Sequence, residues 1–261
     1  MLGFVIPTFG QFEFAAKAVR SAFATRGAED IQVMIVDDAS PAWEQGNRDY
    51  FDPIAEEVGH RLHRDRFCRN RGVTATWNHG LNWLIDLGCD TICVANSDVI
   101  FARNWWQGVN EALTGVKLAG PLTNAPGTHR HQFVGDYCET YTLSDQPEVI
   151  EQVQETLQRE RDGQLVMGAV NGFCMTARAR TWDAGRYDKD HVFCPVNTYS
   201  STGARNPTPL MTLNEDELQR RWGQQGWQSA TVLDSYVFHY RAVSRGDRYK
   251  SGDWFRPLRA A

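Results

Sequence analysis

The chain of 261 residues is 42% hydrophobic and 23% charged, close to the average of globular proteins and enough for one sizeable core. Its formal net charge of -5 gives no electrostatic basis for holding nucleic acid or an anionic membrane. No apolar run approaches the roughly 20 residues that cross a bilayer, and the first residues form a strand-like segment rather than a signal sequence. We therefore expect a soluble, cytoplasmic protein, with peripheral association at a membrane as the alternative.

The first hundred residues have the apolar pattern of a βαβ protein. Continuous β-branched runs at residues 2–7 and 31–36 predict two central parallel strands, and the apolar face of residues 12–23 predicts a helix between them. A second helix over residues 73–84 leads into a third buried strand at residues 91–95. These segments predict a parallel sheet flanked by helices.

In the rest of the chain, the predicted strands and helices alternate less regularly, and the loops between them are longer. We expect a turn and short helix over 101–113, a strand over 116–120, a peripheral polar helix over 148–161, a strand over 166–176, a helix over 214–222 and a final strand over 232–240. Asn214 and Glu217 have the spacing of a capping box. The whole chain, residues 1–261, is predicted to be one α/β domain with a mixed central sheet flanked by helices.

Polar side chains follow three of the predicted strands. Thr8 comes after the first, Asp37 and Asp38 after the second, and the segment from Asn96 to Asp98 after the third. Ligands of open α/β sheets bind at the carboxyl ends of the strands, so a polar crevice is expected there. The two neighbouring aspartates either close a turn or bind the base or ribose of a nucleotide. Asp98 is either a helix cap or a ligand of a hard divalent cation.

Two histidines stand close together in a segment without apolar periodicity. His129 and His131 could share a ligand, but an exposed polar loop is the expected outcome.

Together with further motifs, these strand-end residues resemble the GT-A-fold glycosyltransferases, specifically the inverting family 2 of polysaccharide and rhamnosyl-type transferases. The matching segments, in chain order, are 5–9 (VIPTF), 36–40 (VDDAS), 70–72 (NRG) with 78–81 (NHGL), 96–98 (NSD), 215–216 (ED) with 220–221 (RR), and His239 with Ser244. The resemblance spans residues 3–246. It implies a GT-A fold in which residues 1–100 form the nucleotide-binding half, residues 101–240 the acceptor-binding half and residues 241–261 a basic loop.

The resemblance also implies a metal-assisted transfer of a sugar, with inversion, from a nucleoside-diphosphate sugar to the hydroxyl group of a glycan or other acceptor. Asp98 and His239 would bind Mn²⁺ or Mg²⁺, and Asn96 replaces the first acid of the family's DxD motif. An amide ligand carries no charge, so the cation is expected to depend more on the diphosphate. The nucleotide-binding residues would be Pro7, Thr8, Asp38, Asn70, Asn78, Asn96 and Ser97.

On the acceptor side, the resemblance makes Asp216 the general base and Glu215 its neighbouring acid. Gly172 and Phe173 would lie under the acceptor. The cations that would close over the diphosphate are Arg241, Arg245, Arg248 and Lys250. Other interpretations stay open: acids in the first turn of a helix complement the helix dipole, His239 can be a half-buried strand residue, and a basic tail can be solvated.

Three rival functions remain. A sugar nucleotidyltransferase shares the core but normally has a glycine-rich, cationic loop after the first strand, whereas residues 8–11 contain one glycine and no cation. A non-catalytic nucleotide-binding module is the second rival, and its best support is Asn96 in the place of the first acid of the DxD motif. A transferase acting on modified DNA bases is disfavoured by the acidic balance.

Overall fold

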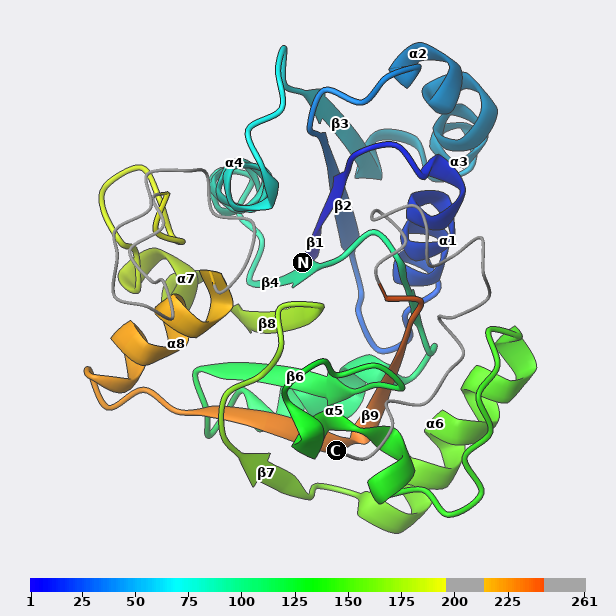
Figure 1. Cartoon of the computed structure of the whole chain (residues 1–261), viewed down its shortest axis with the longest axis vertical. Helices are drawn as coiled ribbons and strands as arrows, with labels where there is room; N and C mark the ends of the chain where they lie inside the picture. The colour runs from blue at the N-terminus through cyan, green and yellow to red at the C-terminus, as the bar shows by residue number, and fades with distance from the viewer. Residues whose placement is uncertain (196–213, 242–261) are drawn as a thin grey trace.

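The computed structural model describes residues 1–195 and 214–241 as a mixed β-sheet with helices on both faces (Figure 1). Within these ranges the sheet has nine strands, in the order β3-β2-β1-β4-β8-β6-β9-β5, with β7 paired to β9. The strands are β1 (Leu2–Thr8), β2 (Ile31–Asp37), β3 (Leu62–Arg66), β4 (Thr91–Ala95), β5 (Val99–Phe101), β6 (Leu118–Leu122), β7 (Leu165–Met167), β8 (Cys174–Arg178) and β9 (Ser229–His239).

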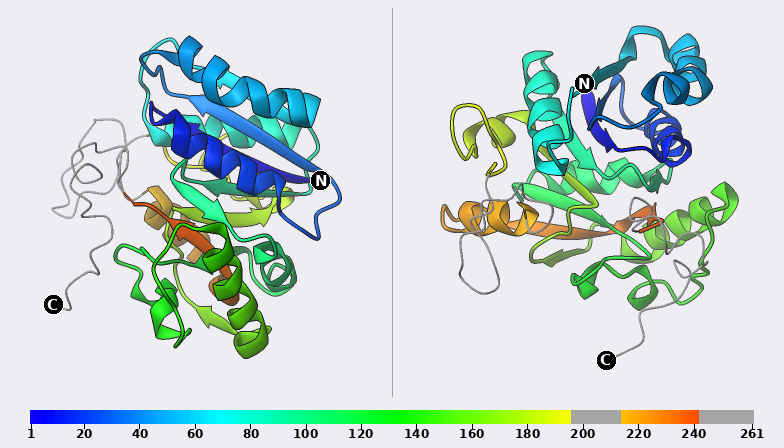
Figure 2. Two further views of the ribbon diagram at one scale, coloured as in Figure 1. Left: turned by 90° about the vertical axis from the view of Figure 1, so that its right-hand side faces the viewer. Right: turned by 45° about the horizontal axis from the view of Figure 1, so that its top comes forward.

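The helices divide between the two faces of this sheet. They are α1 (Phe12–Phe23), α2 (Trp43–Gly46), α3 (Asp52–Val58), α4 (Val73–Asp86), α5 (Trp105–Ala112), α6 (Pro147–Arg161), α7 (Ala179–Ala184) and α8 (Asn214–Gly223), with a π-helical turn at Asn47–Phe51 and 3₁₀ turns at Gly59–Arg61, Arg130–Gln132 and Val134–Asp136. Helices α1, α3, α5 and α6 bury apolar side chains in one core cluster. Figure 2 shows α1 lying along β1 and β2. Helices α4, α7 and α8 bury theirs in another.

The first half of the chain forms the predicted parallel unit. Strand β1 pairs in parallel with β2 and β4, and every residue of β2 and β4 is buried, as expected for continuous apolar runs covered on both faces. Because these three strands run in the same direction, their carboxyl ends meet at one edge of the sheet. This arrangement confirms the expected βαβ pattern.

The second half joins the same sheet through antiparallel pairs. Strand β8 pairs with β4, and the long strand β9 pairs with β6, β7 and β5. The pairing with β5 places His239 opposite Val99, so the end of β9 lies beside the carboxyl end of β4.

Several predicted elements differ from those observed. The strand expected over 166–176 is divided into β7 and β8, and Gly168 between them has φ 153°. Strand β5 occupies the start of the expected turn, and the mostly exposed edge strand β3 was not predicted. The capping box is not formed: the Asn214 amide donates to the Thr74 hydroxyl at 3.1 Å, and Glu217 accepts from Arg221 at 3.1 Å.

Helix α6 was expected to be peripheral, but it covers β9. Its side chains Ile150, Val153 and Leu157 are buried. The amide of Gln154, also buried, donates to the carbonyl oxygen of Asp234 at 2.7 Å and accepts the N–H of Tyr236 at 2.8 Å. This polar side chain therefore bonds directly to the backbone of the strand that ends at His239.

The packing of α4 on β1 generates a stability prediction. A Cβ atom at Gly80 would lie 2.4 Å from Cγ1 of Val5, far inside van der Waals contact. We expect Gly80→Ala to lower the free energy of unfolding by about 1–3 kcal/mol, measured by urea denaturation, because helix and strand must separate. Gly223→Ala is the control, since a Cβ there meets no atom within 4 Å. Equal losses in the two variants would contradict close packing at Gly80.

Candidate active site

A cleft of about 550 Å³ opens where the carboxyl ends of β1, β2 and β4 meet. Its lining includes Pro7, Thr8, Phe9, Gly10, Asp38, Asn70, Gly72, Val73, Thr76, Asn96, Ser97, Asp98, Asn171, His239 and Arg241. The polar crevice predicted from the strand ends is therefore present. The structure brings nine of the predicted site residues into it: Pro7, Thr8, Asp38, Asn70, Asn96, Ser97, Asp98, His239 and Arg241.

The two aspartates after β2 have different roles. The buried carboxylate of Asp37 accepts the backbone N–H of Ser40 at 2.9 Å and also bonds the Ser40 hydroxyl, and the guanidinium of Arg66 lies 3.3 Å away. Burial raises the pKa of this carboxyl group, against the effect of its hydrogen bonds. Asp37 thus closes the turn, which was one of the two interpretations of the pair.

Asp38 instead forms part of the cleft wall. One carboxylate oxygen accepts the backbone N–H of Arg71 at 2.6 Å, and the other accepts that of Gly72 at 2.8 Å. Gly72 has φ 84°, a conformation that glycine adopts without strain, and it directly precedes α4. Asp38 therefore ties the start of α4 to the end of β2.

Three polar side chains converge at the other side of the cleft. Nε2 of His239 lies 3.3 Å from Oδ1 of Asp98 and 3.4 Å from Nδ2 of Asn96. Nδ1 of the same ring lies 3.2 Å from the carbonyl oxygen of Ala125, which can only accept a hydrogen bond, so Nδ1 is the donor. In the neutral ring Nε2 then presents a lone pair. A lone pair beside a carboxylate is an arrangement that a bound cation stabilises, and an imidazole nitrogen and a carboxylate are both common ligands of metal ions.

The position of His239 is fixed from several sides. Asn124, which the sequence analysis did not identify, accepts the backbone N–H of His239 at 2.8 Å and donates to its carbonyl oxygen at 2.9 Å. The ring of Phe173 stacks on the imidazole, with centroids 5.3 Å apart and an interplanar angle of 18°. The imidazole is therefore held in one orientation.

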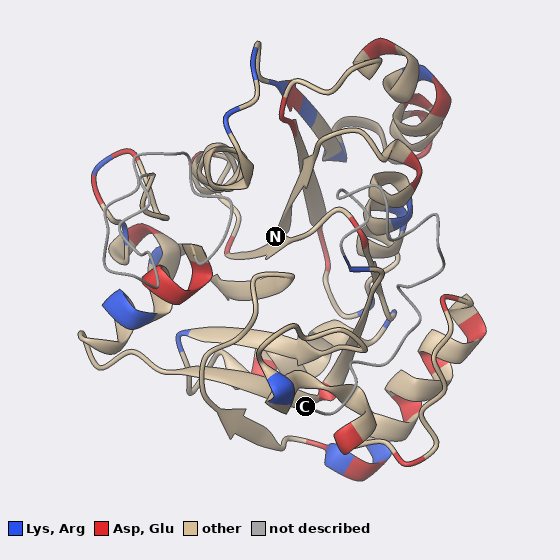
Figure 3. Ribbon diagram, in the orientation of Figure 1, with Lys and Arg blue, Asp and Glu red and all other residues tan. Residues whose placement is uncertain are grey.

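A second group of residues gathers at the start of α8, which carries acids in its first turn and arginines in its last (Figure 3). Glu215 packs closely on Gly172, where a Cβ atom would lie 3.0 Å from the Glu215 carboxyl carbon. Burial raises the pKa of Glu215. The side chain of Asp216 is 38% exposed, and its Oδ1 lies 3.7 Å from Nε2 of His129. His129 was expected in an exposed loop, yet its side chain is only 11% exposed.

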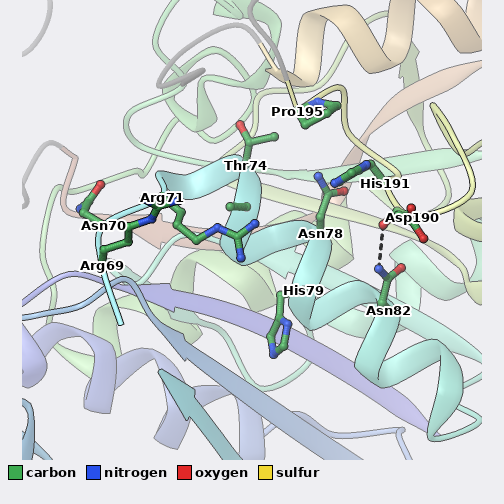
Figure 4. A pocket seen from close by; sticks show the side chains of 11 residues that line it. Arg69, Asn70, Arg71, Thr74, Asn78, His79, Asn82, Asp190, His191 and Pro195 are labelled. Carbon is green, nitrogen blue, oxygen red and sulfur yellow. Dashed lines mark hydrogen bonds between the residues drawn. The ribbon is translucent and has the colours of Figure 1, made fainter. Parts of the chain in front are cut away.

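Asn78, predicted to contact the nucleotide, is not among the residues that line this cleft. Its Oδ1 accepts the backbone N–H groups of Val192 and Phe193 at 2.9 and 2.8 Å, and its Nδ2 donates to the carbonyl oxygen of Phe193 at 3.0 Å. Its amide is thus occupied in fixing this segment to α4. The residue borders a second, polar hollow of about 510 Å³ beside α4 (Figure 4). That hollow is also lined by Arg69, Asn70, Arg71, Thr74, His79, Asn82, Asp190, His191 and Pro195.

Some predicted residues lie outside the described ranges. These are Ser244, Arg245, Arg248 and Lys250.

The N-terminal part of the chain resembles a known family. Residues 4–124 match the family model described as glycosyl transferase family 2. The match includes β1, β2, β4 and the segment from Asn96 to Asp98, so it confirms the resemblance carried by the strand-end motifs. No sequence among the curated proteins matches the chain.

Solved structures show the same fold. One is GalNAc-T7 with UDP, GalNAc and Mn²⁺, with a TM-score of 0.60 and 13% identity over 92% of this chain and 43% of that chain. Another is the mannosyltransferase PcManGT from Pyrobaculum calidifontis in complex with GDP-Man and Mn²⁺, with a TM-score of 0.56 and 12% identity over 91% of this chain and 56% of that one. The chain thus spans about half the length of these proteins. Its fold is GT-A, a mixed central sheet flanked by helices.

The role of Asp38 in the cleft wall can be tested directly. Asp38→Ala leaves the N–H groups of Arg71 and Gly72 without their acceptor. We therefore expect the free energy of unfolding, measured by urea denaturation, to fall by about 1–3 kcal/mol. We expect calorimetric affinity for UDP and GDP to fall as well, because the wall moves. Asp136→Ala removes an exposed ion pair with Arg130, and because water screens such a pair, we expect nearly unchanged stability and unchanged binding. Parent-like stability of Asp38→Ala would contradict this role.

Proposed function

We propose that the chain transfers a sugar from a nucleoside-diphosphate sugar to a hydroxyl group of an acceptor, with inversion at the anomeric carbon. The observation that carries this proposal is the convergence of Asp98 and His239 in a strand-end cleft of a chain whose N-terminal part matches family 2. The two solved proteins of the same fold, one with UDP and Mn²⁺ and the other with GDP-Man and Mn²⁺, support a nucleotide and a cation in such a cleft.

The nucleotide is assigned to the wall formed by the ends of β1, β2 and β4 and by the loop before α4. Thr8, Asp38, Asn70 and Ser97 line this wall, and Phe9 beside them is 48% exposed. The Thr8 hydroxyl already donates to the carbonyl oxygen of Gly10 at 2.9 Å, so it shapes the loop and offers its lone pairs to the ligand. Arg241, on the same cleft, supplies a cation for the diphosphate.

The divalent cation, Mn²⁺ or Mg²⁺, is assigned to Asp98 and His239, with Asn96 as an amide ligand. When bound, it offsets negative charge on the departing diphosphate. A single protein carboxylate is a weak site for a hard cation, so we expect the diphosphate to supply much of the affinity. Phe173 and Asn124 would hold the His239 ring ready without further rearrangement.

We assign the general base to Asp216. Inversion requires the acceptor oxygen to attack from the face opposite the leaving diphosphate while a base takes its proton. Of the three acids that open α8, Glu217 is bound to Arg221 and Glu215 packs closely on Gly172. The side chain of Asp216 is 38% exposed, and we take it to be available to an acceptor. Glu215, Gly172 and Phe173 then form the floor on the acceptor side.

Among residues 1–195 and 214–241, no helix combines the length and the apolar composition needed to cross a membrane.

The assignment of the base generates the test of the proposed function. Release of UDP or GDP is measured with a panel of UDP- and GDP-hexoses and Mn²⁺, with and without alcohol acceptors. We expect Asp216→Asn to lower turnover by roughly 10² to 10⁴-fold, with folding and donor affinity nearly unchanged, because the amide keeps the size of the carboxylate but takes no proton.

The matched comparison is Glu215→Gln, which changes the neighbouring acid in the same way. We expect it to affect turnover less than Asp216→Asn does. If Glu215→Gln abolishes transfer and Asp216→Asn stays within a few-fold of the parent, Glu215 is the base. Absence of sugar release from every donor, with intact nucleotide binding, would instead favour a binding module.

A further inference from the structure

The 3₁₀ turn before Phe133 brings a histidine to the proposed base. Nε2 of His129 lies 3.7 Å from Oδ1 of Asp216, and the imidazole is almost fully covered. A hydrogen bond between these two atoms, with the usual N···O distance of about 2.9 Å, requires them to approach by about 0.8 Å. A change of side-chain torsion in the partly exposed Asp216 can supply this movement. The hydrogen-bond partners of His129 show which of its nitrogens carries the proton.

The orientation of the neighbouring Asn171 amide is fixed by the backbone. Its Oδ1 accepts the N–H of Phe173 at 3.1 Å, and its own backbone N–H donates to Oε1 of Gln132 at 2.7 Å. The NH₂ group must therefore face the other way. There it finds two acceptors for its two hydrogens: the carbonyl oxygen of Pro126 at 3.2 Å and Nδ1 of His129 at 3.3 Å.

This arrangement selects one tautomer of His129. Because Asn171 donates to Nδ1, a neutral imidazole carries its hydrogen on Nε2, the atom that faces Asp216. The Thr128 hydroxyl, 3.4 Å from Nδ1, can donate to the same atom. Protonation of Nδ1 would set its N–H against the amide N–H of Asn171, which disfavours the imidazolium.

Burial and two neighbouring side chains shift the pKa of His129. Burial lowers this pKa, and the nearby ring of His131, at a centroid distance of 5.9 Å, lowers it further. Asp216 is the opposing influence and raises it. Two uncharged groups, the Asn171 amide and the Thr128 hydroxyl, also contact the ring at Nδ1.

We propose that His129, as the neutral Nε2–H tautomer locked by Asn171, is a positioning residue that holds Oδ1 of Asp216 by hydrogen bonding. Oδ2 is then left to accept the proton of the acceptor hydroxyl. The proton moves from the acceptor oxygen to Oδ2, and His129 keeps its own proton throughout. The inference rests on the proposed role of Asp216 in sugar transfer, and it adds a residue that fixes how that carboxylate is presented.

The adjacent His131 does not share this role. Its Nε2 lies 2.8 Å from the carbonyl oxygen of Ala169, so its ring is directed to the connection between β7 and β8. A glutamine at this position can keep that hydrogen bond. His131→Gln is therefore the matched control for substitutions at His129.

The first test is spectroscopic and needs no turnover. Imidazole ¹⁵N spectra of the full chain are recorded across pH, and the His129 signals are assigned by their loss in His129→Gln. We expect the Nε2–H tautomer at neutral pH and a lower His129 pKa in Asp216→Asn, because the anion that raises it is gone. An Nδ1–H tautomer, or a His129 pKa unchanged by Asp216→Asn, overturns the proposal.

The second test is kinetic, with UDP-N-acetylgalactosamine and GDP-mannose as probes in the presence of Mn²⁺. We expect His129→Ala to lower kcat roughly 10- to 100-fold at unchanged donor KM, since a misplaced base reacts slowly. His129→Gln should recover most of this loss by donating its own N–H, and His131→Gln should match the parent. The double variant Asp216→Asn/His129→Ala should be no slower than Asp216→Asn alone.

The outcomes separate the two claims. Parent-like kcat in His129→Ala, or additive losses in the double variant, overturns the role of His129 while leaving Asp216 as the base. Full activity of Asp216→Asn overturns the assigned base, and no release from either probe counts against the proposed function. In either of those cases the spectra still decide whether His129 is held as the Nε2–H tautomer against Asp216.

Discussion

The backbone hydrogen bond from Tyr240 to the carbonyl oxygen of Asp98, at 2.9 Å, joins the two halves of the chain at the cleft. It extends the antiparallel pairing in which Val99 lies opposite His239. The side chains of Asp98 and His239, which lie more than a hundred positions apart in the sequence, thereby come together, with Oδ1 of Asp98 3.3 Å from Nε2 of His239. Without this pairing, a carboxylate at the end of β4 would have no imidazole beside it, and the cation site of the proposed function would lack its second ligand.

The segment from Asn171 to Phe173 connects this site to the acceptor side. Phe173 stacks on His239, while Asn171, two residues earlier, orients His129 toward Asp216. A single short stretch before β8 thus contacts both the proposed cation ligand and the residue that faces the proposed base. Asn171 itself is held by the buried side chain of Gln132 and by the backbone N–H of Phe173.

The parts of this structure that were predictable from the sequence share a physical cause. Strands buried on both faces are continuous apolar runs, so the βαβ unit over residues 2–37 was recognisable, and its strand ends indicated a polar cleft. The edge strand Leu62–Arg66 has no such pattern because most of it faces solvent. His239 was identified only through the family resemblance. The role of His129 was not predictable, because its partner Asp216 lies 87 positions later and no periodicity relates them.

The central claim is that one cleft binds a nucleoside diphosphate and a divalent cation together through Asp98 and His239. Isothermal titration of UDP and of GDP into the protein, with saturating Mn²⁺ or with excess chelator, tests it most directly. The account predicts that Mn²⁺ raises the affinity for at least one diphosphate by about tenfold or more, and that His239→Ala loses most of this coupling while remaining folded. Equal affinity with Mn²⁺ and with chelator for both diphosphates, or full coupling in His239→Ala, would contradict it.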